Sequence, residues 1–344
     1  MEKYGYKFSF GPWNIHEGGD PFGPDVRPSL TFAQKLPLYK ELGFDAVQFH
    51  DDDAVPNLDE MAPAQIGRAA SQVRHQLEDH GLVAEFVAPR LWESPKTIDG
   101  GFTSNSPAER KYALERSKTA ADIARELGCN LMVLWLAREG TYMRESKDVG
   151  RSAHYLLDAI NMLLAYDKDL RIAIEPKPNE PMDLAYIPTM GHALALGLLS
   201  NEPGRVGVLM ESAHSILAGL DPADEIGFAM AFGKLWSVHL NDQNGLKFDQ
   251  DRSFAAVDIR RAFNQVRMLD ENRFWEIGMV GMDVKALRTQ PAELATKHLR
   301  NSLAMFLRLV KLSRSLDRAK MQALIEARDY EELDWFILTH LTRE

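Results

Sequence analysis

Short apolar runs alternate along the chain with longer segments in which apolar residues recur at helical spacing. The apolar runs predict eight strands, over residues 6–13, 46–50, 82–89, 131–136, 172–177, 206–212, 235–241 and roughly 276–284. The longer segments predict a helix after each strand, over residues 32–42, 64–80, 107–127, 152–166, 190–199, 222–232, 256–269 and 292–312. Gly43, Gly81 and Gly128 each directly follow a predicted helix, where a left-handed residue commonly ends the helix.

Strict alternation of strand and helix predicts a parallel sheet, and eight such units favour an α/β fold of the closed (β/α)8 TIM-barrel type. The alternative is an open, doubly wound sheet, but no glycine-rich phosphate loop follows the first strand. The charged segment 313–344 has a helical pattern and lies beyond the eighth unit. We therefore expect a catalytic barrel domain over residues 1–312 and a short C-terminal helical arm over residues 313–344.

Composition narrows the class of protein. With 45% apolar residues the chain can bury enough surface to fold, and its single cysteine, Cys129, cannot form an internal disulfide. The net charge of −10 argues against nucleic acid or an anionic membrane as a partner. No run reaches the roughly 18 apolar residues of a membrane span, and the N-terminus lacks the apolar core of a signal peptide. We expect a soluble, cytoplasmic protein.

Carboxylates and imidazoles gather where the predicted strands end, which is the end of a barrel that carries the active site. His50 closes the second strand, and Glu175 and Lys177 share one face of the fifth because they are two residues apart. Other candidates stand at or after the remaining strands: Trp13, Trp92, Trp135, Glu211, His214, His239, Asp249, Asp251 and Asp283. Converging carboxylates repel one another unless a divalent cation joins them. Oxygen ligands suit Mg²⁺ or Mn²⁺, and imidazole shifts the preference toward Mn²⁺ or Co²⁺.

Each candidate also has a purely structural interpretation. An isolated Asp-x-Asp is usually a solvated turn, a lone histidine at a strand end is usually packed, and tryptophans are often core residues. The run Asp51–Asp53 alone is typical of a helix N-terminus. The conjunction of acidic or imidazole groups after strands 2, 5, 6, 7 and 8 favours a metal site over these interpretations.

The same stretches resemble the xylose isomerases, in their shorter, actinobacterial-type class. The matching motifs, in family order, are Asp20-Pro-Phe-Gly23, Phe49-His-Asp-Asp-Asp53, Asp99-Gly-Gly-Phe-Thr103, Arg138-Glu-Gly140, Ile174-Glu-Pro-Lys-Pro-Asn-Glu-Pro181, Glu211-x-x-His214, Lys247-Phe-Asp-Gln-Asp251 and Asp283-x-Lys285-x-x-Arg288-Thr289. The resemblance implies a sugar isomerase that converts D-xylose to D-xylulose, or a related sugar, by ring opening and a metal-assisted hydride shift. It also implies two divalent metal ions per subunit, Mn²⁺, Co²⁺ or Mg²⁺.

The resemblance assigns roles residue by residue. Lys177 matches the lysine that bonds to the carbonyl end of the sugar, and His50 and Asp53 match the pair linked to ring opening. Phe22 matches an aromatic that reaches into a neighbouring subunit's site, which implies a homotetramer built as a dimer of dimers. The ligands of the structural metal correspond to Glu175, Glu211, Asp283 and His239, those of the catalytic metal to Glu211, His214, Asp249 and Asp251, and the walls of the sugar pocket to Trp13, Trp92 and Trp135.

Three departures from the family pattern bear on the substrate. The first is His239, which stands where the family has an aspartate. In the second, Ala88 and Arg90 replace a threonine and an asparagine, and Trp92 replaces the phenylalanine that follows them. The third is the short C-terminal arm. These changes alter the hydrogen bonds available to a sugar and place a new positive charge near the pocket.

Two other functions stay open at this point. The same barrel and metal site would serve a keto-sugar epimerase or a dehydratase that works by proton transfer, with Glu175 or Glu211 as the base. A barrel that binds sugar without catalysis is a further, non-enzymatic alternative.

Overall fold

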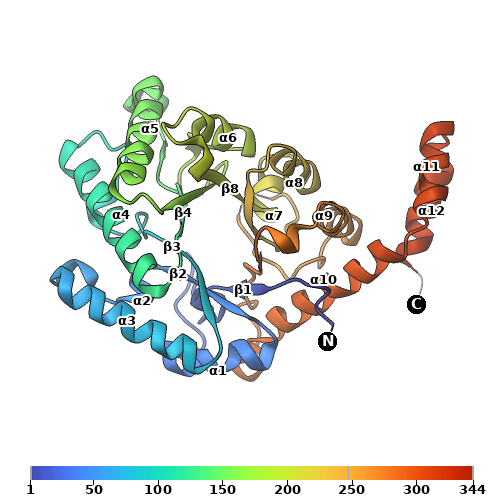
Figure 1. Cartoon of the computed structure of the whole chain (residues 1–344), viewed down its shortest axis with the longest axis horizontal. Coiled ribbons are helices and arrows are strands. Elements are labelled where there is room, and N and C mark those ends of the chain that lie inside the picture. Colours follow the sequence, from blue (N-terminus) through green and yellow to red (C-terminus); the bar gives the residue numbers. More distant parts are fainter. Residues whose placement is uncertain (1, 247, 343–344) are drawn as a thin grey trace.

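The computed structural model describes residues 2–246 and 248–342, so Lys247 of the predicted 247–251 motif lies outside the described residues. The strands form a closed barrel in the order β1-β10-β9-β8-β6-β4-β3-β2, and every neighbouring pair is parallel. Figure 1 shows the helices arranged around these strands. The predicted (β/α)8 TIM barrel is therefore confirmed.

The barrel strands are short and almost entirely buried. They are β1 (Phe8–Phe10), β2 (Ala46–His50), β3 (Val83–Ala88), β4 (Leu131–Trp135), β6 (Arg171–Glu175), β8 (Val206–Glu211), β9 (Leu235–His239) and β10 (Val280–Gly281). A separate antiparallel pair consists of β5 (Gly140–Thr141) and β7 (Leu184–Ala185). The helices are α1 (Phe32–Leu42), α2 (Asp51–Ala54), α3 (Pro63–Asp79), α4 (Pro107–Leu127), α5 (Val149–Tyr166), α6 (Met190–Leu198), α7 (Ser212–Leu217), α8 (Pro222–Ala231), α9 (Ile259–Glu271), α10 (Lys297–Ser315), α11 (Arg318–Ala327) and α12 (Tyr330–Leu341).

Local signals set the helix boundaries. The Thr31 hydroxyl accepts a hydrogen bond from the Gln34 backbone N–H at the start of α1, and Gly43 ends the helix at φ +93°. Ser106 caps α4 in the same way, and Gly128 ends it at φ +82°. Glycine adopts this left-handed conformation without steric cost, so after each of the two helices the backbone turns directly toward the next strand.

The inside of the barrel contains a polar layer among apolar ones. Ser9, Gln48, Glu85 and Ser237 are buried and come from β1, β2, β3 and β9. The outer core is aromatic and aliphatic, and Phe306 of α10 packs edge-on against Phe8. A buried polar group must be hydrogen-bonded, so the polar layer constrains how its members are oriented.

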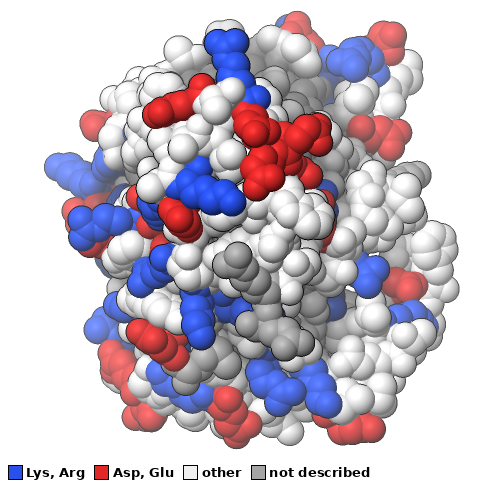
Figure 2. All heavy atoms as spheres, turned by 90° about the vertical axis from the view of Figure 1, so that its right-hand side faces the viewer, with Lys and Arg blue, Asp and Glu red and all other residues white. Residues whose placement is uncertain are grey.

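The C-terminal segment continues from α10, which passes residue 312 and ends at Ser315. Figure 1 shows α11 and α12 side by side beyond the end of α10, projecting away from the ring of helices around the barrel. His340 of α12 donates from Nε2 to the Leu312 carbonyl at 2.8 Å, and Arg260 of α9 pairs with Asp334. On this side of the molecule, Lys and Arg are interspersed with Asp and Glu (Figure 2). Within residues 2–246 and 248–342, no helix is long and apolar enough to cross a membrane.

Candidate metal and sugar site

A cavity of about 810 Å³ opens where the barrel strands end. Each predicted ligand reaches it from a strand end or from the segment that follows. Glu175 ends β6, Glu211 ends β8, His239 ends β9, and Asp283 follows β10. Parallel strands end at the same rim of a barrel, so residues more than a hundred positions apart meet there.

One group of ligand atoms surrounds the imidazole of His239. Its Nδ1 lies 3.3 Å from Glu211 Oε2, 3.4 Å from Glu175 Oε1 and 3.8 Å from Asp283 Oδ2. The ligand atoms of Glu211, His239 and Asp283 all lie within 4.8 Å of one another. The four side chains predicted for the structural metal are therefore brought together.

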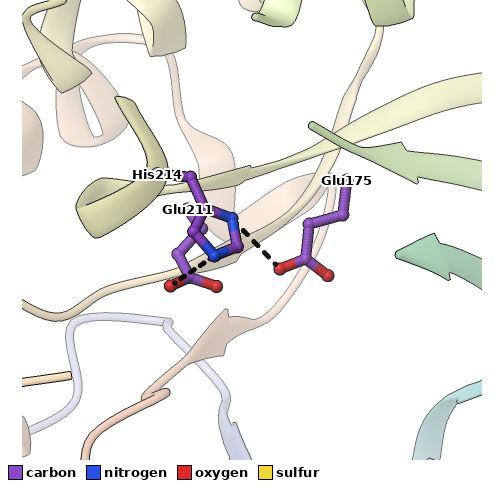
Figure 3. Close-up of side chains that lie close together, drawn as sticks. All are labelled: Glu175, Glu211 and His214. Carbon is purple, nitrogen blue, oxygen red and sulfur yellow. Dashed lines mark ion pairs between the residues drawn. The ribbon is translucent and has the colours of Figure 1, made fainter. Parts of the chain in front are cut away.

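A second group forms around His214 of α7. Its Nε2 lies 3.1 Å from Asp249 Oδ2 and 3.3 Å from Glu211 Oε1. Figure 3 shows its imidazole between Glu211 and Glu175, with Nδ1 3.6 Å from Glu175 Oε1. Asp251 is also close, since it can offer an oxygen within 4.8 Å of those of Glu211 and Asp249. Glu211 belongs to both groups, as the resemblance implies for a bridging ligand.

The electrostatics of the two groups show how crowded the carboxylates are. Burial raises the pKa of Glu211, and burial together with neighbouring Asp249 raises that of Asp251. Burial also raises the pKa of Glu175, but the imidazoles of His239 and His214 outweigh it and bring the value down to about 2. The charged forms of Glu211 and Asp251 are therefore disfavoured in the site, which is a condition that a divalent ion relieves.

Two atoms show directly that the site fits a cation. His214 Nδ1 and Asp249 Oδ1 are buried and have no hydrogen-bond partner among the described residues. Asp249 Oδ1 always carries lone pairs, and His214 Nδ1 carries one in the neutral tautomer that has its proton on Nε2. Both atoms belong to side chains of the second group. A buried acceptor without a partner is costly, so these atoms fit a bound metal ion better than an apolar contact. Carboxylate oxygens with imidazole nitrogens are ligands that Mn²⁺ and Co²⁺ accept readily.

Lys177 enters the cavity two residues after the end of β6. Its Nζ lies 2.9 Å from Asp249 Oδ2 and 3.4 Å from Glu180 Oε2, and 5.1 Å from the centre of the Trp135 ring. Burial lowers the pKa of Lys177, but Asp249 and Glu180 outweigh it and raise the value above its usual range. The side chain is a fixed positive charge beside the second ligand group.

His50 and Asp53 form a pair, and Arg90 joins it. His50 Nδ1 lies 2.8 Å from Asp53 Oδ2 and 2.7 Å from Arg90 Nη2. Arg90 also pairs with Asp53 Oδ1 at 3.2 Å and with Asp52 Oδ1 at 2.7 Å. The carboxylate requires a proton on Nδ1, whereas the guanidinium can only donate, so the two compete for the same nitrogen.

The three predicted aromatic walls all line the cavity. Trp13 stacks on His50 with ring centres 4.1 Å apart, and Trp92 packs edge-on against Trp135 at 4.4 Å. Trp135 Nε1 is buried without a partner among the described residues, so it is a donor available to a sugar hydroxyl. Phe22 does not line this chain's cavity and is 84% exposed.

Several residues that the sequence did not single out hold the ligands in place. Asn241 donates from Nδ2 to Glu211 Oε1 at 2.9 Å and to Asp251 Oδ1 at 3.1 Å. Asn14 donates to Asp283 Oδ1 at 2.6 Å. The sequence could have indicated Asn241, because it lies two residues after His239 in the predicted strand and hence on the same face. Asn14 carried no such signal, since it belongs to a 3₁₀ turn after β1.

The chain is similar to known proteins in both sequence and fold. The family described as xylose isomerase-like TIM barrel matches residues 36–290 of the chain. A xylose isomerase of Thermus thermophilus is 34% identical over 293 residues, which cover 84% of this chain and 75% of the relative.

Solved structures show the same fold at lower identity. A D-tagatose 3-epimerase-like protein has a TM-score of 0.64 at 15% identity, and covers 89% of this chain and 98% of its own. A D-psicose 3-epimerase crystallised in the presence of D-fructose has a TM-score of 0.63 at 13% identity, with 88% and 99% covered. At these identities the likeness is one of fold alone.

Proposed function

Because the chain belongs to the xylose isomerase-like TIM-barrel family, we propose that it is a divalent-metal-dependent aldose–ketose isomerase acting on D-xylose or a related sugar. The observation that carries the proposal is the convergence in one cavity of two ligand groups joined by Glu211, with the ammonium of Lys177 beside them. Two divalent ions, when bound, act as Lewis acids on the sugar oxygens at C1 and C2.

The residues around the cavity divide the remaining tasks. His50, oriented by the hydrogen bond of its Nδ1 to Asp53, moves a proton from the anomeric hydroxyl to the ring oxygen and so opens the ring. Trp13, Trp92 and Trp135 bind the faces of the sugar and exclude water.

The isomerisation itself needs no external oxidant. A hydride moves from C2 to C1, so C2 is oxidised to the ketone and C1 is reduced to the alcohol. Lys177 stabilises the negative charge on O1, and the carboxylate of Asp251 helps to move the proton from O2 to O1. Glu175, Glu211, His239 and Asp283 would hold one ion, and Glu211, His214, Asp249 and Asp251 would hold the other.

A keto-sugar epimerase or dehydratase is the second candidate, and His239 is the residue that favours it. Its imidazole gives the first ligand group one negative charge fewer than an aspartate would. Proton transfer at carbon, however, needs a free base. Glu175 and Glu211, the carboxylates available for this, both face imidazoles within 3.6 Å and are ligands in the proposed site. The hydride shift uses no such base.

We also propose a homotetramer in which Phe22 reaches into a neighbouring subunit's cavity, because this ring is exposed beside Phe248 rather than inside its own cavity. A cytoplasmic location remains our prediction. Equilibrium sedimentation of the wild-type protein and of Phe22→Ala tests the assembly. A monomeric wild-type protein would contradict it.

The experiment that tests the function is a panel of aldoses and ketoses offered to chelator-stripped protein with and without added Mn²⁺, Co²⁺ or Mg²⁺. We expect interconversion of at least one aldose and its ketose that depends on added metal. Epimer formation from a ketose would support the second candidate instead. Sugar binding with no turnover under any metal would support the non-enzymatic alternative.

A further inference from the structure

A buried carboxylate lies one layer below the ligand groups, inside the barrel. Glu85 of β3 is 8% exposed and accepts hydrogen bonds at both of its oxygens. Oε1 accepts from the Ser237 hydroxyl at 2.7 Å, and Oε2 accepts from the Ser9 hydroxyl and from Gln48 Nε2, the latter at 3.1 Å. Its hydrogen-bond partners among the described residues include no proposed metal ligand, so its role in the site is indirect.

Gln48 connects this carboxylate to the site above. Its side chain is fully buried, and its Oε1 lies 3.1 Å from Nε2 of His239. The two ends of a glutamine amide are alike in shape, so the partners decide which end points where. An ionised carboxylate can only accept, and therefore the amide nitrogen of Gln48 faces Glu85 and its oxygen faces His239.

This direction passes on to the imidazole. The amide oxygen of Gln48 can only accept a hydrogen bond, so Nε2 of His239 must carry a proton and donate it to this oxygen. Nδ1 of a neutral His239 is then left with a lone pair, and Nδ1 is the atom that faces Glu175, Glu211 and Asp283 at 3.3 to 3.8 Å.

We propose that Glu85, acting through Gln48, fixes the tautomer of His239 and so makes Nδ1 a metal ligand. The inference rests on the metal site of the proposed function, and Glu85 and Gln48 are positioning residues in it. Hydrogen-bond partners of this kind orient metal-bound imidazoles and raise their basicity. Here Glu85 and Gln48 fit the imidazole of His239 for metal binding. An aspartate at this position has no tautomers and would not need these two partners.

Gly281 of β10 keeps the space that this contact needs. A Cβ at this position would run into Gln48 Nε2, and it would lie 2.7 Å from the Val238 carbonyl oxygen and 3.0 Å from His239 Cδ2. Any larger residue would therefore push the amide and the imidazole apart. The glycine, the amide and the carboxylate together form one support beneath the imidazole.

The first test measures the tautomer directly in the wild-type protein. Chelator-stripped wild-type protein with ¹⁵N-labelled histidine is loaded with Zn²⁺, and long-range ¹H–¹⁵N correlations report which imidazole nitrogen carries the proton. The His239 signals are identified by their loss in His239→Asn. We expect a proton on Nε2 and a metal-bound Nδ1. A proton on Nδ1 would overturn the proposal.

The second test measures the Zn²⁺ affinity of the same site by competition with a chelator, followed on the His239 signals. Glu85→Gln lets the amide of Gln48 turn over, and we expect a loss of affinity of about 10- to 100-fold. Ser237→Ala is the matched control, because it removes a hydrogen bond from the same carboxylate without touching Gln48. We expect the Zn²⁺ affinity of Ser237→Ala to stay within about threefold of the wild type, which is a smaller loss than the roughly 10-fold minimum expected for Glu85→Gln.

The outcomes separate this inference from the proposed function. Zn²⁺ bound through Nδ1, with a selective loss in Glu85→Gln, supports both. Zn²⁺ bound with the opposite tautomer, or equal affinities in the two variants, overturns the role of Glu85 and leaves the metal site standing. A wild-type protein that binds no Zn²⁺ at these residues overturns both. If Glu85→Gln does not fold, the tautomer in the wild-type protein decides.

Discussion

Replacing Lys177 with methionine removes one charge from the cavity while keeping most of the side-chain volume. The side chain is 7% exposed, and its ammonium group lies 2.9 Å from Asp249 Oδ2 and is the cation proposed to stabilise the charge on O1. Methionine fills the space beside Trp135 but cannot donate a hydrogen bond. The substitution therefore tests the charge and the donor rather than the packing.

The size of the effect follows from the distances. A full charge on O1 about 3 Å from Nζ would interact with it by roughly 5 to 6 kcal/mol at an effective dielectric constant of about 20. Part of this interaction is already made with Asp249 in the resting site, so the gain that is specific to the transition state is smaller. A single well-placed donor to a developing oxyanion contributes about 3 to 4 kcal/mol, which corresponds to a 10² to 10³-fold loss of kcat.

The assay compares kcat, KM and bound metal for the wild-type protein, Lys177→Met and a control. Lys147→Met is the matched control, because Lys147 is also a buried lysine beside a carboxylate, 3.4 Å from Asp99 Oδ1, but lies outside the cavity. We expect Lys177→Met to lose kcat and keep its metal ions, and Lys147→Met to lose stability but not kcat. A kcat for Lys177→Met within about threefold of the wild type, or a loss that merely follows loss of metal, would refute this reasoning.

Three further predictions follow from the ligand groups and from one buried histidine. Glu211→Gln should weaken the binding of both metal ions because Glu211 belongs to both ligand groups, whereas Asp251→Asn should weaken mainly the binding of one. Calorimetric metal titration checks this. Equal losses of affinity for both ions in Asp251→Asn would contradict two distinct sites. Mn²⁺ or Co²⁺ should activate better than Mg²⁺ because His239 supplies an imidazole, and His239→Asp should narrow the difference; higher activity with Mg²⁺ in the wild-type protein would contradict this. Burial lowers the pKa of His298 to about 4, against about 6.5 when unfolded, so stability should fall by roughly 3 kcal/mol as the pH decreases from 6.5 to 4. Denaturant unfolding of His298→Gln should show a smaller loss over this range, and an equal loss would show that other groups are responsible.

The alternation of apolar runs and helical segments was sufficient to predict the barrel. The predicted strand 46–50 and helices 32–42 and 107–127 coincide with β2, α1 and α4, because clear caps and glycines mark their ends. The predicted strand 276–284 is longer than β10, which contains only Val280 and Gly281. A 3₁₀ turn over Phe274–Glu276 occupies the stretch before it, and this turn leaves no mark in the apolar pattern.

The residues of the candidate site could be predicted from the sequence, but the hydrogen-bond partners that orient them could not. A barrel brings strand ends to one rim, so His50, Glu175, Glu211 and His239 could be placed together from their positions alone. The partners of these residues could not. Gln48 contacts both Glu85 and His239, and these contacts depend on barrel stagger and side-chain torsions, which a single polar residue in an apolar strand does not reveal.

The path of the hydrogen between C2 and C1 tests the central claim most directly. Metal-loaded protein is incubated with its aldose in deuterated water, and the ketose is analysed by NMR for deuterium at C1. A hydride shift beside Lys177 and the two ligand groups predicts a product that takes its new C1 hydrogen from C2 and carries no solvent deuterium there. Deuterium from the solvent at C1 would show proton transfer through a base and would contradict the account.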